Sequence, residues 1–373
     1  MTNLDQETVG TQRRPTGMTG MAGGGFYDAN SAPQWEQIAA VLPWLEDTLS
    51  SLPFEKGSGP VTFADFGCSE GRNSISVMRH LIGKTMQQTD RPFLTIHSDL
   101  PTNDYSKLFL GLRPDGQSTF GSQRVSSAAV GGSMYDQLLP PDSVHIATTF
   151  NSIGYLSERP LNKLPGYVLP NGPSKRRANG HVTEAESKIF AKQAEDDMAA
   201  FLTARANELV SGGKLMVQVF GCTNELRTCD GLFDLLNDAL LAHVKLGNIS
   251  SQVYERYYQP VYFRSLEELT SPLTNSAYNL AGLYTLDRTE SYEVPVPFVE
   301  AYKQDKDLDR YATNYVNFFR AFTQAVLRGN LPDTPSKANL LDQIYKTAET
   351  LLKATPEDYS FRNISVAMLL TRK

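Results

Sequence analysis

Apolar positions follow two patterns that alternate between residues 33 and 221. Short, nearly continuous apolar runs predict buried strands, and longer stretches with apolar residues at helical spacing predict helices. The strand-like runs are 61–67, 92–100, 126–134 (where a third strand ends), 143–153 and 212–221. The helix-like stretches are 33–52, 73–82, 104–110 and 184–209. This alternation predicts an α/β protein with a doubly wound, mostly parallel sheet and right-handed crossovers.

The pattern changes after Cys222, where helix-like stretches dominate almost to the end of the chain. They are 232–244, 266–269, 297–301, 314–327 and 336–354, and a strand-like run, 363–371, follows them. A terminal strand usually completes a sheet begun earlier. We therefore predict three parts: a flexible polar N-terminal tail (1–22), an α/β core (23–222 and 360–373) and a mainly helical cap (223–359).

Composition narrows the function classes. The 373 residues are 40% apolar and 20% charged, with a formal net charge of −6 and no basic stripe, which argues against nucleic-acid and anionic-membrane partners. No run of about 18 apolar residues predicts a membrane span. Three cysteines (Cys68, Cys222 and Cys229) form no disulfide framework, so we expect a cytoplasmic protein. The five histidines are scattered without metal-ligand spacing, and no metal is expected.

The most informative local motif is DFGCSEG (65–71), which follows the first predicted strand. Its glycines, Gly67 and Gly71, allow backbone to approach a nucleotide-like cofactor that a Cβ would exclude. A dinucleotide-binding turn would place glycine where this chain has Ser69, which counts against NAD and FAD and favours a smaller cofactor. An ordinary tight turn between a strand and a helix is the alternative.

Two further segments stand where such a cofactor would extend. Asp99 ends the second predicted strand, and its carboxylate suits the two ribose hydroxyls of an adenosine, although it could equally cap the next helix. GGSMY (131–135) follows the third strand, which makes Ser133 and Met134 candidate adenine neighbours. A plain Gly-Gly turn explains that second segment almost as well.

Taken together, the motifs resemble the SABATH family of plant-type carboxyl methyltransferases, which use S-adenosylmethionine. GGGFYDANSAPQ (23–34) resembles the family's G-G-x-x-S-Y-x-x-N-S-x-x-Q, and DFGCSEGRNS (65–74) its D-L-G-C-S-x-G-x-N-T. SDLPTNDYSKLF, GGSMYDQLLPPDSVH, SIGYLSERP, GGKLMVQVFG and the final NISVAMLLTRK match further family segments in the same order. Several co-linear matches are far more specific than any one of them.

The resemblance implies the Rossmann-like fold of a class I methyltransferase with an α-helical cap over the substrate pocket. It implies S-adenosylmethionine as cofactor and S-adenosylhomocysteine as product. By position, the residues that surround the cofactor would be Tyr27, Ser31, Gly67, Asn73, Asp99, Leu100, Ser133 and Met134.

The same resemblance places the substrate, a small hydrophobic or aromatic carboxylic acid. Gln34 would bind one carboxylate oxygen. Tyr155 stands where many members have a tryptophan that holds the other oxygen, and Gly154, where they have His or Met, vacates volume beside it. Leu232 and Phe233 fall near a pair that lines the acyl pocket. Core packing is the alternative for Tyr155 and for this pair.

These residues imply methyl transfer by in-line displacement, with Gln34 and Tyr155 as positioning groups. A carboxylate is already ionised at neutral pH, so no general base is needed. Where some family members show a metal, this chain has Tyr258 in place of their asparagine, so none is expected. Alternatives are a methyltransferase acting on a heteroaromatic nitrogen, a catalytically silent S-adenosylmethionine-binding protein and, more remotely, a nicotinamide oxidoreductase. Relatives are commonly dimers, so a homodimer is possible.

Overall fold

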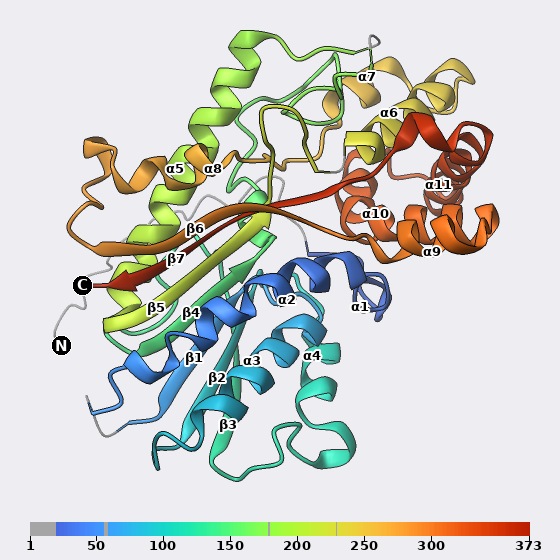
Figure 1. The fold of residues 1–373 in the computed structure, drawn as a ribbon. Coiled ribbons are helices and arrows are strands. Elements are labelled where there is room, and N and C mark those ends of the chain that lie inside the picture. Colours follow the sequence, from blue (N-terminus) through green and yellow to red (C-terminus); the bar gives the residue numbers. More distant parts are fainter. Residues whose placement is uncertain (1–19, 56–58, 178–179, 229) are drawn as a thin grey trace, which may run out of the picture.

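The computed structural model describes residues 20–55, 59–177, 180–228 and 230–373. Within these residues a seven-stranded sheet has the order β3-β2-β1-β4-β5-β7-β6 (Figure 1). The strands are β1 (Val61–Phe66), β2 (Phe93–Asp99), β3 (Val125–Gly131), β4 (Val144–Phe150), β5 (Leu209–Phe220), β6 (Tyr284–Val294) and β7 (Asn363–Arg372). β1 to β5 pair in parallel, and β7 is antiparallel to both β5 and β6.

The five parallel strands and the terminal strand confirm the α/β fold expected from the sequence. β5 begins three residues earlier than expected, because Leu209 already pairs with Val144. β6 was not predicted from the sequence, and it lies inside the segment expected to be mainly helical. Its residues YTLDRTESYEV are mostly polar and exposed, as at the edge of a sheet, so they lack the apolar alternation of a half-buried strand.

Helices cover both faces of the sheet (Figure 1). On one face lie α2 (Ala32–Glu46), α3 (Arg72–Thr85) and α4 (Tyr105–Leu112). On the other lie α5 (Glu184–Glu208) and α8 (Leu266–Thr270). Each face has its own apolar cluster, one around Phe63, Val77 and Met216 and the other around Phe66, Met198 and Leu215. The strands alternate side chains between these clusters, which fixes their register.

The remaining helices pack together as a cap beyond the carboxyl ends of the parallel strands (Figure 1). They are α6 (Asp230–Lys245), α7 (Ser251–Arg256), α9 (Pro297–Asp305), α10 (Leu308–Asn330) and α11 (Lys337–Ala354). Their core is rich in aromatic residues, among them Phe298, Tyr315 and Phe318. Among the described helices, none combines the length and the apolar character needed to cross a bilayer.

Residues 20–22, the first that the structure describes, connect the sheet and its helices to the cap. The backbone N–H of Ala22 donates to Ala321 O of α10 (3.0 Å), and Met21 packs against the cap cluster. Residues 20–22, which we placed in the N-terminal tail, are therefore in contact with the cap, and residues 1–19 lie outside the described part of the chain. A short helix, α1 (Phe26–Ala29), follows and leads through Ser31 into α2.

Candidate functional site

The site lies between the carboxyl ends of β1 and β4, where the order in which the chain adds strands to the sheet reverses. The chain leaves β1 toward β2 on one side and leaves β4 toward β5 on the other, an arrangement that opens a crevice for ligands. Gly67 follows β1 with φ 96°, and Asn151 follows β4 with φ 63°. A Cβ on Gly67 would lie 1.9 Å from Ser152 Oγ, so this turn requires glycine.

A cleft of about 940 Å³ opens at this point between core and cap. Its floor is formed by the strand ends, including Gly67, Asp99 and Asn151. Its cap side is apolar and largely aromatic, lined by Met21, Phe220, Phe233, Val261, Phe263 and Phe322. A smaller hollow of about 350 Å³ adjoins the cleft and shares six lining residues with it, Tyr27, Gln34, Gly67, Ser69, Phe150 and Asn151.

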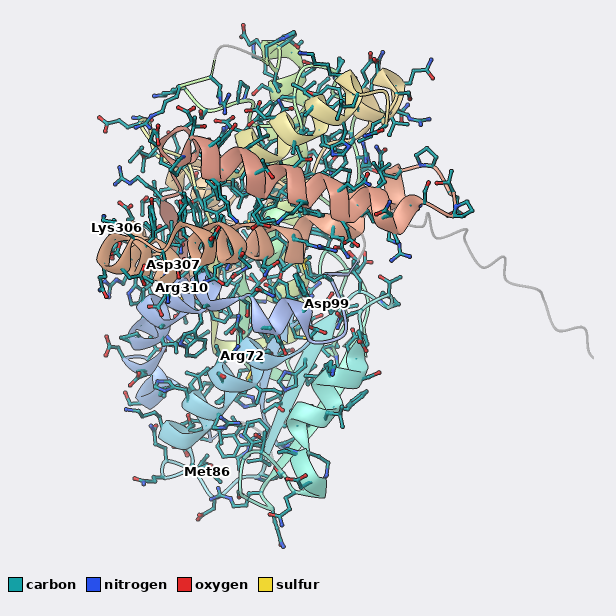
Figure 2. All side chains as sticks on the ribbon, turned by 90° about the vertical axis from the view of Figure 1, so that its right-hand side faces the viewer. Arg72, Met86, Asp99, Lys306, Asp307 and Arg310 are labelled. Atoms are coloured by element: carbon teal, nitrogen blue, oxygen red, sulfur yellow. The ribbon has the colours of Figure 1, made fainter. Side chains whose placement is uncertain are left out.

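Asp99 is held at the end of β2 by two backbone groups. Its Oδ2 accepts from Ser69 N and its Oδ1 from Leu100 N, both at 2.7 Å. Burial raises the pKa of the Asp99 carboxyl, while these two hydrogen bonds act in the opposite direction. Asp99 does not cap α4, because Asp104 is the N-cap and accepts from Ser106 N. In Figure 2, Asp99 lies on the core just below the cap helices.

Residues 23–34 form a strap that crosses the end of β1. The carboxylate of Glu70, in the turn after β1, accepts from Gly25 N (2.5 Å) and Asp28 N (3.1 Å). Arg72, labelled on the core in Figure 2, donates to Asp28 O (2.8 Å). These contacts hold the strap over the turn, and Tyr27 and Gln34 of the strap line the cleft.

Two polar groups of the strap and the turn are buried without a partner. Gln34 is 2% exposed, and its Oε1 has no hydrogen-bond partner among the described residues. Ser69 Oγ is likewise buried without a hydrogen-bond partner among the described residues. Buried polar atoms are normally paired, so these two indicate a polar ligand in the cleft.

Most of the predicted site residues meet at these two hollows. Tyr27, Gln34, Gly67, Asp99, Leu100, Met134, Tyr155 and Phe233 line the cleft. Asn73 lines the smaller hollow, and its Nδ2 donates to Ser31 Oγ at 3.5 Å. Ser31 is 1% exposed and is not among the lining residues, so it supports Asn73 from behind. Ser133 is not a lining residue either, and its hydroxyl accepts from Tyr135 N.

Two expectations on the substrate side need correction. Leu232 is fully buried in the cap core, whereas its neighbour Phe233 lines the cleft, because consecutive residues of a helix face different directions. Gly154 does not vacate volume beside Tyr155. The place of its missing side chain lies 3.3 Å from methyl groups of Val219 and Val261, which fill the space.

Asn151 and, apart from Phe233, the aromatic wall of the cleft were not predicted from the sequence. Asn151 was detectable as a polar residue that ends a buried strand, the position at which α/β proteins place ligand-binding groups. Phe220, Phe263 and Phe322 carried no comparable signal, because an aromatic residue of a pocket and one of a core look alike in a sequence.

The chain matches the family model described as "SAM dependent carboxyl methyltransferase" over residues 14–373. Among its relatives is gibberellic acid methyltransferase 1 of Arabidopsis thaliana, which is 26% identical over 81% of this chain and 84% of the relative. Indole-3-acetate O-methyltransferase 1 of Oryza sativa subsp. japonica is 27% identical over 76% and 75%. The solved structure of a loganic acid methyltransferase with SAH aligns with a TM-score of 0.75 at 24% identity, covering 95% of this chain and 98% of that one.

The architecture is the fold of a class I methyltransferase. The chain belongs to the S-adenosylmethionine-dependent carboxyl methyltransferases, which confirms the SABATH resemblance. It is thus a carboxyl O-methyltransferase with S-adenosylmethionine as its cofactor.

The residues at the strand ends fit this cofactor. Gly67 lines the cleft, and Ser152 packs where its Cβ would lie, so only glycine brings the backbone this close to the ligand. The carboxylate oxygens of Asp99 each keep a lone pair for a ribose hydroxyl. Among the described residues, no group of three or more His, Cys, Asp or Glu is placed to hold a metal ion.

Proposed function

We propose that this enzyme converts a small hydrophobic or aromatic carboxylic acid to its methyl ester. The observation that carries the proposal is the composition of the cap side of the cleft. This side of the cleft is lined by four phenylalanines, Phe220, Phe233, Phe263 and Phe322. Among the described residues that line the cleft there is no lysine, arginine or histidine. An acid whose only polar end is its carboxylate suits such a wall, because the apolar body is buried and no second charge is left unpaired.

The proposed reaction depends on position rather than on proton transfer. Bound S-adenosylmethionine supplies an electrophilic methyl group on its sulfonium sulfur. Gln34, which ends the strap, would hold the ionised carboxylate near that methyl group, and the aromatic wall would fix the acid's body and exclude water. Alignment of this kind contributes on the order of 7 to 11 kcal/mol to a reaction of two bound groups.

A panel of carboxylic acids incubated with S-adenosylmethionine and analysed by mass spectrometry tests the proposal. We expect products heavier by one CH₂, formed from apolar and aromatic acids and hydrolysed by mild base. Base-stable products from heteroaromatic amines would instead favour N-methylation. S-adenosylhomocysteine binding without any product would favour a silent homologue.

We propose further that the enzyme is cytoplasmic and forms a homodimer. The three cysteines, which form no disulfide framework, support the first point, and the dimers common in the family support the second. The predicted division into core (23–222 and 360–373) and cap (223–359) likewise stays a prediction. Expressing 223–359 without the core would test the last point.

A further inference from the structure

We propose that Asn151 supplies a hydrogen-bond donor to the carboxylate of the acid, in the role that the sequence analysis gave to Tyr155. This inference rests on the proposed function, because it names a second positioning group for the same substrate. Asn151 is 8% exposed and lines both the cleft and the smaller hollow. Its Nδ2 has no hydrogen-bond partner among the described residues.

The orientation of the Asn151 amide is fixed by its neighbours. Its Oδ1 accepts from the backbone N–H of Phe220 and from Gln218 Nε2, both at 3.1 Å. The backbone N–H can only donate, so the atom that faces it must be the oxygen. The NH₂ group is therefore the other end of the planar amide, and this is the end without a partner. A buried donor without an acceptor destabilises the folded protein, and a ligand oxygen would remove that cost.

Tyr155 lines the cleft, but its hydroxyl is directed at the cap. It donates to Phe322 O of α10 at 3.0 Å and receives a hydrogen bond from Gln259 Nε2 at 3.3 Å. A hydroxyl has one proton, so a donor committed to Phe322 O is not available to a carboxylate oxygen. Tyr155 thus braces the loop after β4 against α10.

Gln34 and Asn151 both line the two adjoining hollows, and the unpaired atom is an acceptor in Gln34 (Oε1) and a donor in Asn151 (Nδ2). Gln34 comes from the strap, and Asn151 from the end of β4. Of the two carboxylate oxygens, one can accept from Asn151 Nδ2, and the other would accept from Gln34 Nε2 once the Gln34 amide turns that nitrogen toward it. Two amide donors would hold it without a positive charge, which leaves the oxygen nucleophilic.

The test uses Asn151→Asp, which keeps the oxygen that faces Phe220 and replaces the donor by an acceptor. Calorimetry with excess S-adenosylhomocysteine would measure the affinity for benzoate, phenylacetate and indole-3-acetate and for their primary amides. For the tightest-binding acid, we expect Asn151→Asp to lose at least about tenfold affinity, whereas the amide, which can donate to Asp, becomes the preferred ligand.

Asn279→Asp is the matched control. Asn279 is also a left-handed asparagine (φ 55°), but it is exposed and lies in the loop before β6, so its variant should keep the wild-type preference for the acid. Tyr155→Phe should likewise keep the preference for acid over amide. Affinity for S-adenosylhomocysteine reports whether each variant is folded.

The proposal is overturned if Asn151→Asp keeps the wild-type acid affinity, or if Tyr155→Phe loses the preference for the acid. If Asn151→Asp does not fold, the preference of Tyr155→Phe for the acid over the amide is the deciding measurement. Wild-type protein that binds none of the acids would overturn the inference as well. An acid that binds with the expected Asn151 dependence, yet is never methylated, would overturn the proposed function alone.

Discussion

The backbone conformation of single residues decides which groups reach the cleft. Gly67, Ser69 and Asn151 all have positive φ (96°, 50° and 63°), and all three line the cleft. For residues other than glycine a positive φ costs free energy, and residues held in this conformation concentrate at functional sites. Asparagine tolerates it well, which explains how a polar side chain could be placed directly after β4. Only the glycine was evident from the sequence.

Gln34→Ala should weaken binding of the acid and leave the cofactor largely unaffected. Removing the amide deletes a hydrogen bond to an ionised group, so we expect a loss of about tenfold in acid affinity and less than about threefold in S-adenosylhomocysteine affinity. Titration calorimetry measures both. The exposed Gln87→Ala serves as control. A larger loss of cofactor affinity than of acid affinity would remove Gln34 from this role.

Asp99→Asn should act on the cofactor. It replaces an acceptor of the proposed ribose contact by a donor, so affinity for S-adenosylhomocysteine should fall about 10- to 100-fold. Fluorescence or calorimetric titration measures the change, with the exposed Asp115→Asn as control. Unchanged cofactor affinity would mean that Asp99 only organises the turn through Ser69 N and Leu100 N.

At the scale of elements, the strap depends on the turn after β1. Glu70 is 2% exposed and accepts from two backbone N–H groups of the strap. The sequence indicated both the strap and the turn, but not the contact that holds them together. The contact between them is long-range, because Gly25 and Glu70 are 45 residues apart, and no local pattern announces it.

Glu70→Ala should loosen the strap. Gly25 N and Asp28 N lose their acceptor, so we expect faster amide exchange across residues 25–31 and a fall of about three- to tenfold in affinity for S-adenosylhomocysteine. Hydrogen exchange with mass spectrometry and calorimetry would report the two effects. Glu36→Ala, an exposed change on α2, is the control. Unaltered exchange in this segment would show that other contacts hold the strap.

For the whole molecule, buried carboxyl groups make stability depend on pH. Asp65, the penultimate residue of β1, is 3% exposed. Burial raises the pKa of its carboxyl to about 6 despite a hydrogen bond from Thr148 Oγ1. Because this pKa is higher in the folded state, the folded protein binds more protons between about pH 4 and pH 6. The free energy of unfolding therefore falls as pH rises through that window.

Asp65→Asn removes this dependence. Relative to wild type, the free energy of unfolding of the variant should rise by about 2 kcal/mol between pH 4.5 and pH 7.5. Urea denaturation at the two pH values measures the difference, in which contributions from other groups cancel. Asp47→Asn, at an exposed position, controls for the loss of one negative charge. A difference that does not change with pH would contradict the role of Asp65.

The sequence by itself determined the α/β order, the glycine turn at Gly67 and the family, because these depend on local periodicity and on motifs in a fixed order. Only the tertiary structure decided the rest. It placed β6 at the sheet edge, since a polar edge strand has no apolar signature. It also directed the Tyr155 hydroxyl to Phe322 and left Asn151 Nδ2 unpaired in a hollow that Gln34 also lines. Such pairings join residues far apart in the chain, and they exist only once core and cap are packed together.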